Sequence, residues 1–217
     1  MSLDDTESNQ EPAGLPPLRH LDDARTLRAL AHPVRIAIVE KLSLGGPLTA
    51  TEVGERIGET PTTCSFHLRQ LAKYGYVEEA GGGKGRARPW RMTSIGYQVA
   101  STHDNPETQV AANALVRLVR ERQLDRYREW RETQSTYSRE WREAAGDSEF
   151  VFFLTARELK ELNDELVDML RPRFLERLTD PSQRPPGSVP VEMLIFSYPI
   201  EPPPAEGDGQ PGPGGES

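Results

Sequence analysis

Few residues in this 217-residue chain have the types and spacing that catalysis requires. The nearest approach to a phosphate-binding loop is Gly81-Gly82-Gly83-Lys84-Gly85, but this run lacks the GxxxxGK[ST] spacing and lies between two expected strands. We find neither a nucleophile–base arrangement nor a carboxylate pair suited to acid–base chemistry. The sequence therefore predicts that the protein is not an enzyme.

Metal and redox chemistry are also poorly represented. The four histidines never stand in an i, i+4 pair, and the only faint cluster is His103-Asp104 followed by Glu107. The single cysteine, Cys64, cannot form an internal disulfide or build a thiolate metal site alone. We predict no metal and no cofactor, and we interpret Cys64 as a small buried hydrophobe, with a thiol sensor as the alternative.

The clearest chemical signal is a group of cations among glycines. Lys84, Arg86 and Arg88 lie within the segment 81–89, where they can follow phosphates or enter a narrow minor groove. The alternative is a plain solvated loop. Arg91 either extends this patch or pairs with Glu78 or Glu79 across a hairpin. The net charge is −8, but residues 21–100 carry eleven bases against eight acids, so a DNA contact belongs in this part of the chain.

A second group of polar residues opens a helix expected over 61–74. Small polar side chains near the start of a helix, with hydrogen-bonding and positive groups further along, suit the major groove. Phe66 either contacts a thymine methyl group or packs inside, and Arg69 either meets phosphate or is simply solvated. The candidate DNA-binding residues of this helix are Thr62, Thr63, Ser65, Phe66, His67, Arg69 and Gln70.

The elements that position these groups follow from periodicity and breakers. Apolar spacing and caps predict helices over 21–31, 33–44, 51–57 and 61–74, with Thr49 or Thr51 as the cap of the third. Gly45-Gly46-Pro47, Gly58 and Gly75 end the last three helices. Residues 76–80 and 90–92 read as strands on either side of the basic tip 81–89. Two short helices with a tight turn, followed by such a hairpin, form a winged helix-turn-helix.

The stretch from Leu21 to Val99 resembles the ArsR-type winged-helix regulators of bacteria. The resemblance rests on "LAHPVRIAIVEKL", on "TTCSFHLRQLAKYGYVEEAGGGKGRARPWRMTSIGY" and on the spacing between them. It implies that Thr62, Thr63, Ser65, Phe66 and His67 face DNA, although many relatives carry Arg where this chain has Phe66. It also implies a homodimeric repressor on a pseudo-palindromic operator, here in an actinobacterial-type branch that does not sense metals.

The second half predicts a long helix over 107–145, a strand over 149–154, a helix opened by the capping box Thr155–Glu158, and a strand over 189–198. Pro172 is expected to kink or end the second of these helices. We assign the long helix and the amino-terminal helix to dimerisation, with an effector pocket as the alternative role of the aromatic residues. The residues assigned to dimerisation are Leu27, Leu118, Tyr127, Trp130, Tyr137 and Trp141.

The predicted fold class is α+β, mainly α. The predicted divisions are a disordered tail 1–17, a winged helix-turn-helix domain 18–100, a dimerisation and possible effector domain 105–200 with strand–helix–strand at 149–199, and a disordered tail 201–217. We expect a cytoplasmic protein that binds double-stranded DNA as a homodimer, without a membrane and with an unknown small-molecule effector possible. The alternatives are a winged-helix protein-interaction module and a thiol- or ligand-responsive switch.

Overall fold

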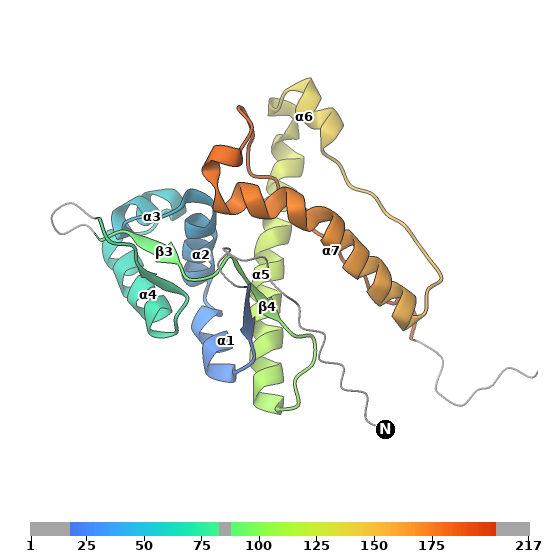
Figure 1. Cartoon of the computed structure of the whole chain (residues 1–217), viewed down its shortest axis with the longest axis horizontal. Coiled ribbons are helices and arrows are strands. Elements are labelled where there is room, and N and C mark those ends of the chain that lie inside the picture. Colours follow the sequence, from blue (N-terminus) through green and yellow to red (C-terminus); the bar gives the residue numbers. More distant parts are fainter. Residues whose placement is uncertain (1–17, 83–87, 203–217) are drawn as a thin grey trace, which may run out of the picture. The chain divides into compact units, whose positions relative to one another are not determined.

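A computed structural model describes residues 18–82 and 88–202 (Figure 1). Residues 1–17 and 203–217 of the two predicted disordered tails, together with Lys84 and Arg86 of the basic tip, lie outside the described residues. The chain divides into two units, the first formed by residues up to 149 with 175–184 and the second by 150–174 with the residues after 184.

The first unit contains, after a short first strand, four helices whose ends are set by local caps. They are α1 (Ala24–Leu30), α2 (Pro33–Gly45), α3 (Ala50–Ile57) and α4 (Pro61–Lys73). Thr49 and Glu52 form a capping box at α3, and the Thr60 side chain accepts the N–H of Thr63 at the start of α4. Gly58 takes the left-handed conformation at φ 74°, which closes α3 and starts the tight turn to α4.

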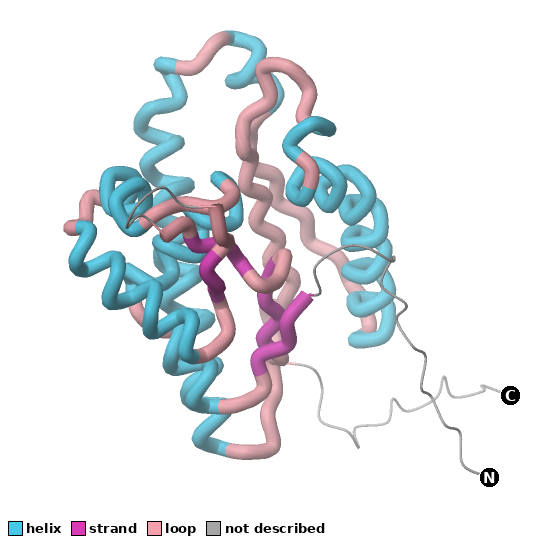
Figure 2. The backbone as a smooth tube through the Cα atoms, turned by 60° about the vertical axis from the view of Figure 1, so that its left-hand side comes forward, coloured by secondary structure: helices cyan, strands magenta, loops and turns pink. Residues whose placement is uncertain are grey.

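Two small sheets complete the winged domain (Figure 2). Strands β2 (Val77–Glu79) and β3 (Trp90–Met92) pair antiparallel, with Val77 opposite Met92, and form the predicted wing. Strands β1 (Leu18–Leu21) and β4 (Gly96–Val99) pair in parallel. This second pair was not predicted from the sequence, and the first helix, predicted from Leu21, starts only after its cap, Asp23.

One apolar core holds these elements together. Leu27, Ile38, Val53, Leu68 and Leu71 are completely buried, and Ala111, Ala112 and Leu115 of α5 (Pro106–Thr133) close the same core. Helix α5 packs along α1, and it is joined to α2 by the pairs that Arg122 and Arg126 make with Glu40, both at 2.7 Å. The α+β fold with a winged helix, predicted from the sequence, is confirmed.

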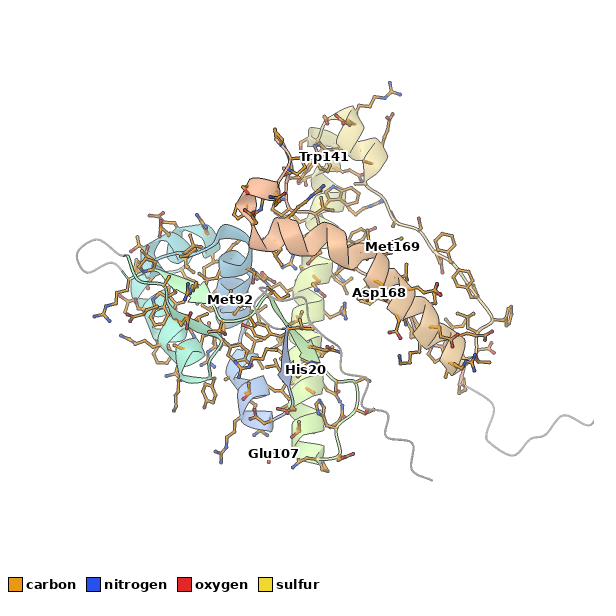
Figure 3. The ribbon with its side chains drawn as sticks, viewed as in Figure 1. His20, Met92, Glu107, Trp141, Asp168 and Met169 are labelled. Atoms are coloured by element: carbon orange, nitrogen blue, oxygen red, sulfur yellow. The ribbon has the colours of Figure 1, made fainter. Side chains whose placement is uncertain are left out.

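The long helix predicted over 107–145 is interrupted. Helix α5 ends at Thr133, and a 3-10 turn η1 (Gln134–Thr136) separates it from α6 (Arg139–Ala144). The segment between them is rich in Ser and Thr, whose side chains compete for backbone hydrogen bonds, and Ser138 caps the new helix at Trp141. Figure 3 labels Trp141 on this short helix.

Helix α7 (Ala156–Thr179) begins at the predicted capping box, and its residues up to 174 belong to the second unit. The helix does not end at Pro172, and it is followed by the 3-10 turn η2 (Pro181–Gln183). The strands predicted over 149–154 and 189–198 are not formed in the described single chain, where both segments are extended without ladder hydrogen bonds. A strand needs a partner as well as a suitable sequence, and among the described residues neither segment belongs to a sheet.

No helix among the described residues is both long enough and apolar enough to cross a lipid bilayer.

Candidate nucleic-acid interface

Helix α4 presents one continuous exposed stripe. Thr62, Phe66, Arg69 and Lys73 follow each other at intervals of four, three and four residues and are all exposed. Phe66 keeps half of its surface open to solvent, at 50%. The helix contains no acidic residue, so the stripe is apolar and polar at its start and positive at its end. Such a face suits an anionic groove with readable base edges.

Thr63, Ser65 and Gln70 flank this stripe and are half-buried. The Thr63 hydroxyl lies 2.9 Å from the Thr60 hydroxyl, so this threonine takes part in the cap of α4. Lys73 was not among the sequence candidates, although its position eleven residues after Thr62 places it on the same helical face. The exposed stripe therefore extends one helical turn beyond the last residue predicted for it, Gln70.

His67 does not lie on this stripe but is buried between α4 and the start of α2. Its ring lies 4.6 Å from the ring of His32, and its Nδ1 accepts the Arg35 Nε–H at 3.4 Å. Arg35 also donates to the Ala29 carbonyl oxygen at 2.6 Å, and the Nδ1 of His32 accepts the N–H of Val34 as the cap of α2. His67 thus packs α4 against the start of α2, and its ring is not exposed on the surface of the helix.

This arrangement predicts that acid weakens the domain. Burial is the main cause that lowers the pKa of both His32 and His67 from the ordinary value of 6.5, and the charge of Arg35 acts in the same direction. Because the folded state favours the neutral rings, the stability is fully present above pH 6.5 and is lost as the pH falls through the lower folded-state pKa values.

We expect His32→Asn to reduce this loss, since asparagine keeps a cap acceptor and does not titrate. Urea unfolding between about pH 7.5 and pH 5 measures the effect. At about pH 7.5 we expect the unfolding free energy of the variant to differ from that of the parent protein by less than about 0.5 kcal/mol. An unchanged pH slope in this variant would show that His32 does not contribute to it.

The described part of the wing carries paired charges. Arg88 donates to both carboxylate oxygens of Glu79 at 3.0 Å, and Arg91 donates to Glu78 at 2.8 Å through Nε. The second contact confirms the cross-hairpin pairing considered for Arg91. All four side chains are largely exposed, so these pairs are screened and weak, and a phosphate can compete for the arginines.

Cys64 is completely buried on the inner face of α4, and burial raises the pKa of its thiol. A raised pKa disfavours the thiolate that a redox sensor needs. Within the ranges 18–82 and 88–202, no group of three or more His, Cys, Asp and Glu side chains is arranged to hold a metal ion.

The residues assigned to dimerisation are distributed between the core and the surface. Leu27 is completely buried in the core of its own chain, so its side chain offers no surface to a partner. Leu118, Tyr127 and Trp130 of α5 are half-buried. Tyr137 and Trp141 are exposed, at 46% and 38%.

An open hollow of about 380 Å³ lies between α2 and α5. Pro33, Ile36 and Leu118 form its apolar lining, and Arg122 and Arg126 reach across to Glu40 beside it. None of the aromatic residues considered for an effector pocket lines this hollow.

The helix-turn-helix part of the chain matches a known protein family. A family model described as a helix-turn-helix domain matches residues 30–79. No curated protein matches the chain. Among solved structures, reduced HlyU from Vibrio cholerae N16961 is 23% identical, with 42% of this chain and 82% of that chain covered and a TM-score of 0.28. A mutant form of ZitR from Lactococcus lactis is 12% identical, with 65% and 73% covered and a TM-score of 0.26.

The matched residues run from the end of α1 to the last residue of β2, and therefore contain the whole of the helix-turn-helix and the first wing strand. The chain carries a winged helix-turn-helix domain, and the family match supports a DNA-binding regulator.

Proposed function

We propose that this protein is a homodimeric transcriptional regulator of ArsR type that represses genes by binding a pseudo-palindromic operator in the cytoplasm. The observation that carries the proposal is the exposed, acid-free stripe of α4. In this proposal the start of the stripe reads bases in the major groove, and its positive end contacts phosphate. Thr62, Ser65, Phe66 and Gln70 carry out the reading and Arg69 contacts phosphate, with Thr63 and His67 holding the helix in place.

The wing supplies the second contact in this proposal. Lys84, Arg86 and Arg88 approach the backbone or the minor groove, and Arg88 exchanges Glu79 for a phosphate on binding. Helix α5 holds two copies together through the face where Val116 is 42% exposed and where Tyr127 and Trp130 lie further along. Two copies then present two α4 helices to half-sites about 34–36 Å apart or a multiple of that spacing.

A protein-interaction module is the second candidate. It is favoured by the pairing of Arg88 and Arg91 with acids of the wing and by the exposed ring of Phe66. This candidate predicts that Arg69, Arg86 and Arg88 can be removed without any change in DNA affinity.

Selection from a random duplex pool decides between the two candidates. We expect the purified full chain, at about 0.15 M salt, to enrich an inverted repeat with the half-site spacing given above. We expect Arg86→Ala/Arg88→Ala to bind that repeat weakly, whereas Arg139→Ala, which removes an exposed arginine of α6, binds it like the parent. No enrichment, with equally weak binding by all three proteins, would refute the direct regulator.

A further inference from the structure

Arg35 of α2 lies at the point where three helices meet. Its Nη1 donates to the carbonyl oxygen of Ala29 in the last turn of α1 at 2.6 Å, and its Nε donates to Nδ1 of His67 in α4 at 3.4 Å. Carbonyl groups in the last turn of a helix lack a partner within that helix, so the first bond satisfies one of them. Arg35 is half-buried, and its planar guanidinium connects the end of α1 to the inner face of α4.

The other contacts of α4 define its rotation about its own axis less well. Cys64 and Leu68 are completely buried, but apolar packing has no preferred direction, in contrast to a hydrogen bond. The far end of the helix is fixed where the Gly75 carbonyl oxygen accepts the Nη1–H of Arg19 at 2.7 Å. Among the described residues, Arg35 makes the hydrogen bond that joins a side chain of α4 to another helix.

A change in this rotation reaches the exposed stripe of α4 directly. The ring of Phe66 meets the ring of His67 edge-on, with centroids 5.2 Å apart. A helix with its side chains is about 10–12 Å across, so a rotation of about 20° moves a side chain at its surface by about 2 Å. Hydrogen bonds and methyl contacts to base edges tolerate much smaller displacements. The contact between Arg35 and His67 therefore determines whether the stripe meets the bases in the right orientation.

We propose that Arg35 is a positioning residue for DNA recognition: it fixes the rotation of α4 through the unprotonated Nδ1 of His67, and sequence-specific binding depends on this contact. The proposal rests on the proposed function, since the stripe that Arg35 orients is the one proposed to read the operator. Arg35 acts through His67 and does not have to touch DNA. Its charge alone does not suffice, because the two acceptors bind different nitrogens of the guanidinium, whereas a lysine offers only one nitrogen.

The contact of Arg35 with His67 exists only while the histidine ring is neutral. A proton on Nδ1 of His67 would turn the acceptor into a donor and place a cation beside Arg35, with its ring centroid 4.6 Å from that of His32. Burial lowers the pKa of His67, the charges of His32 and Arg35 lower it further, and Glu59 between α3 and α4 acts in the opposite direction. The contact is therefore complete above the ordinary pKa of 6.5 and is lost as the pH falls through the lower folded-state pKa.

Fluorescence anisotropy of the full chain with the selected operator and with unrelated DNA tests the role of Arg35. We expect Arg35→Lys to weaken operator binding at least about fivefold and binding to unrelated DNA less than about twofold, because the charge is kept and the geometry is lost. Arg28→Lys is the matched control, since it makes the same substitution at an exposed arginine of α1 that pairs with Glu107. This control should bind both kinds of DNA like the parent protein.

The pH profile distinguishes a positioning role from a purely structural one. From about pH 7.5 to about pH 5, we expect the parent protein to lose at least about fivefold in operator affinity, while its affinity for unrelated DNA does not fall, since acid adds positive charge. His67→Asn offers an oxygen acceptor that does not titrate, so it should lose less than about twofold over the same range. Circular dichroism at both pH values checks that each protein is folded. An acid loss of equal size in His67→Asn would refute the dependence on Nδ1.

Hydrogen exchange without DNA separates this proposal from the regulator function. We expect the amides of residues 64–71 in α4 to exchange at least about fivefold faster in Arg35→Lys than in the parent protein, with residues 111–115 of α5 unchanged. Unchanged exchange in α4, operator binding by Arg35→Lys like that of the parent, or equal losses on both kinds of DNA would each overturn the proposal. A failure of the regulator function appears instead in the parent protein, which would then enrich no operator, and the exchange result alone would decide whether Arg35 holds α4.

Discussion

Tyr76→Ala is expected to lower the unfolding free energy of the winged domain by about 3–5 kcal/mol, the cost of removing a large aromatic side chain from a packed core. Tyr76 is completely buried where the wing joins the helices. Its hydroxyl donates to the Thr26 carbonyl oxygen at 2.8 Å, and its ring meets that of Tyr97 edge-on with centroids 4.9 Å apart. The Arg19 guanidinium lies 4.8 Å from the ring centroid.

The variant Tyr76→Phe separates the packing from the hydrogen bond. It keeps the ring contacts with Tyr97 and Arg19 and removes only the hydroxyl, so we expect a loss of about 1–2 kcal/mol. Leu44→Ala is the control, because Leu44 is 45% exposed on α2 and a surface change of this kind costs less than about 0.5 kcal/mol. Urea unfolding followed by circular dichroism measures all three. A loss below about 1 kcal/mol in Tyr76→Ala would contradict the anchoring role.

The sequence predicted the parts of this fold that depend on local contacts and did not predict the pairing that depends on distant ones. The caps at Thr49, Thr60 and Thr155 depend on residues within one turn, and the helices they open were predicted close to their observed starts. The parallel pairing of β1 with β4 was not predicted because Leu18 and Gly96 lie far apart in the sequence and are brought together only by the packing of the whole domain. No local pattern marks such a pair, and Leu21 reads equally well as the start of a helix.

The candidate site was predictable to the extent that one helical face determines it. Thr62, Phe66 and Arg69 were predicted from spacing and type, and they share the exposed stripe. The family resemblance predicted His67 on the DNA-facing side of α4, but the close packing of α4 against α2 buries it beside His32. The closeness of this packing depends on residues far away in the sequence, so it cannot be predicted from the sequence of α4 alone. The segments 149–154 and 189–198 present the converse case, since a strong local strand preference did not produce a sheet there.

Phe66→Ala and Arg69→Ala are expected to weaken operator binding in two different ways. Phe66 is half-exposed on the stripe and has no charge, so its contact with a thymine methyl group contributes to the choice of sequence. Its loss should cost about 1–3 kcal/mol on the selected operator and little on unrelated DNA, which lowers the specificity ratio by about 5- to 150-fold. Folding should be unaffected, because half of this ring already faces water.

Arg69 lies one turn further along and carries a charge that every DNA sequence attracts. Arg69→Ala should weaken binding to the operator and to unrelated DNA by similar factors and reduce the slope of log K against log salt by about one. Fluorescence anisotropy over a salt series measures both variants, with Arg139→Ala as the control for a change in net charge, since Arg139 is exposed on α6 and pairs with Glu143. Equal losses on both kinds of DNA in Phe66→Ala would refute its role in base reading, and an unchanged salt slope in Arg69→Ala would refute the phosphate contact. If both variants bind like the parent, the exposed stripe of α4 does not face DNA, and the protein-interaction module becomes the better account of it.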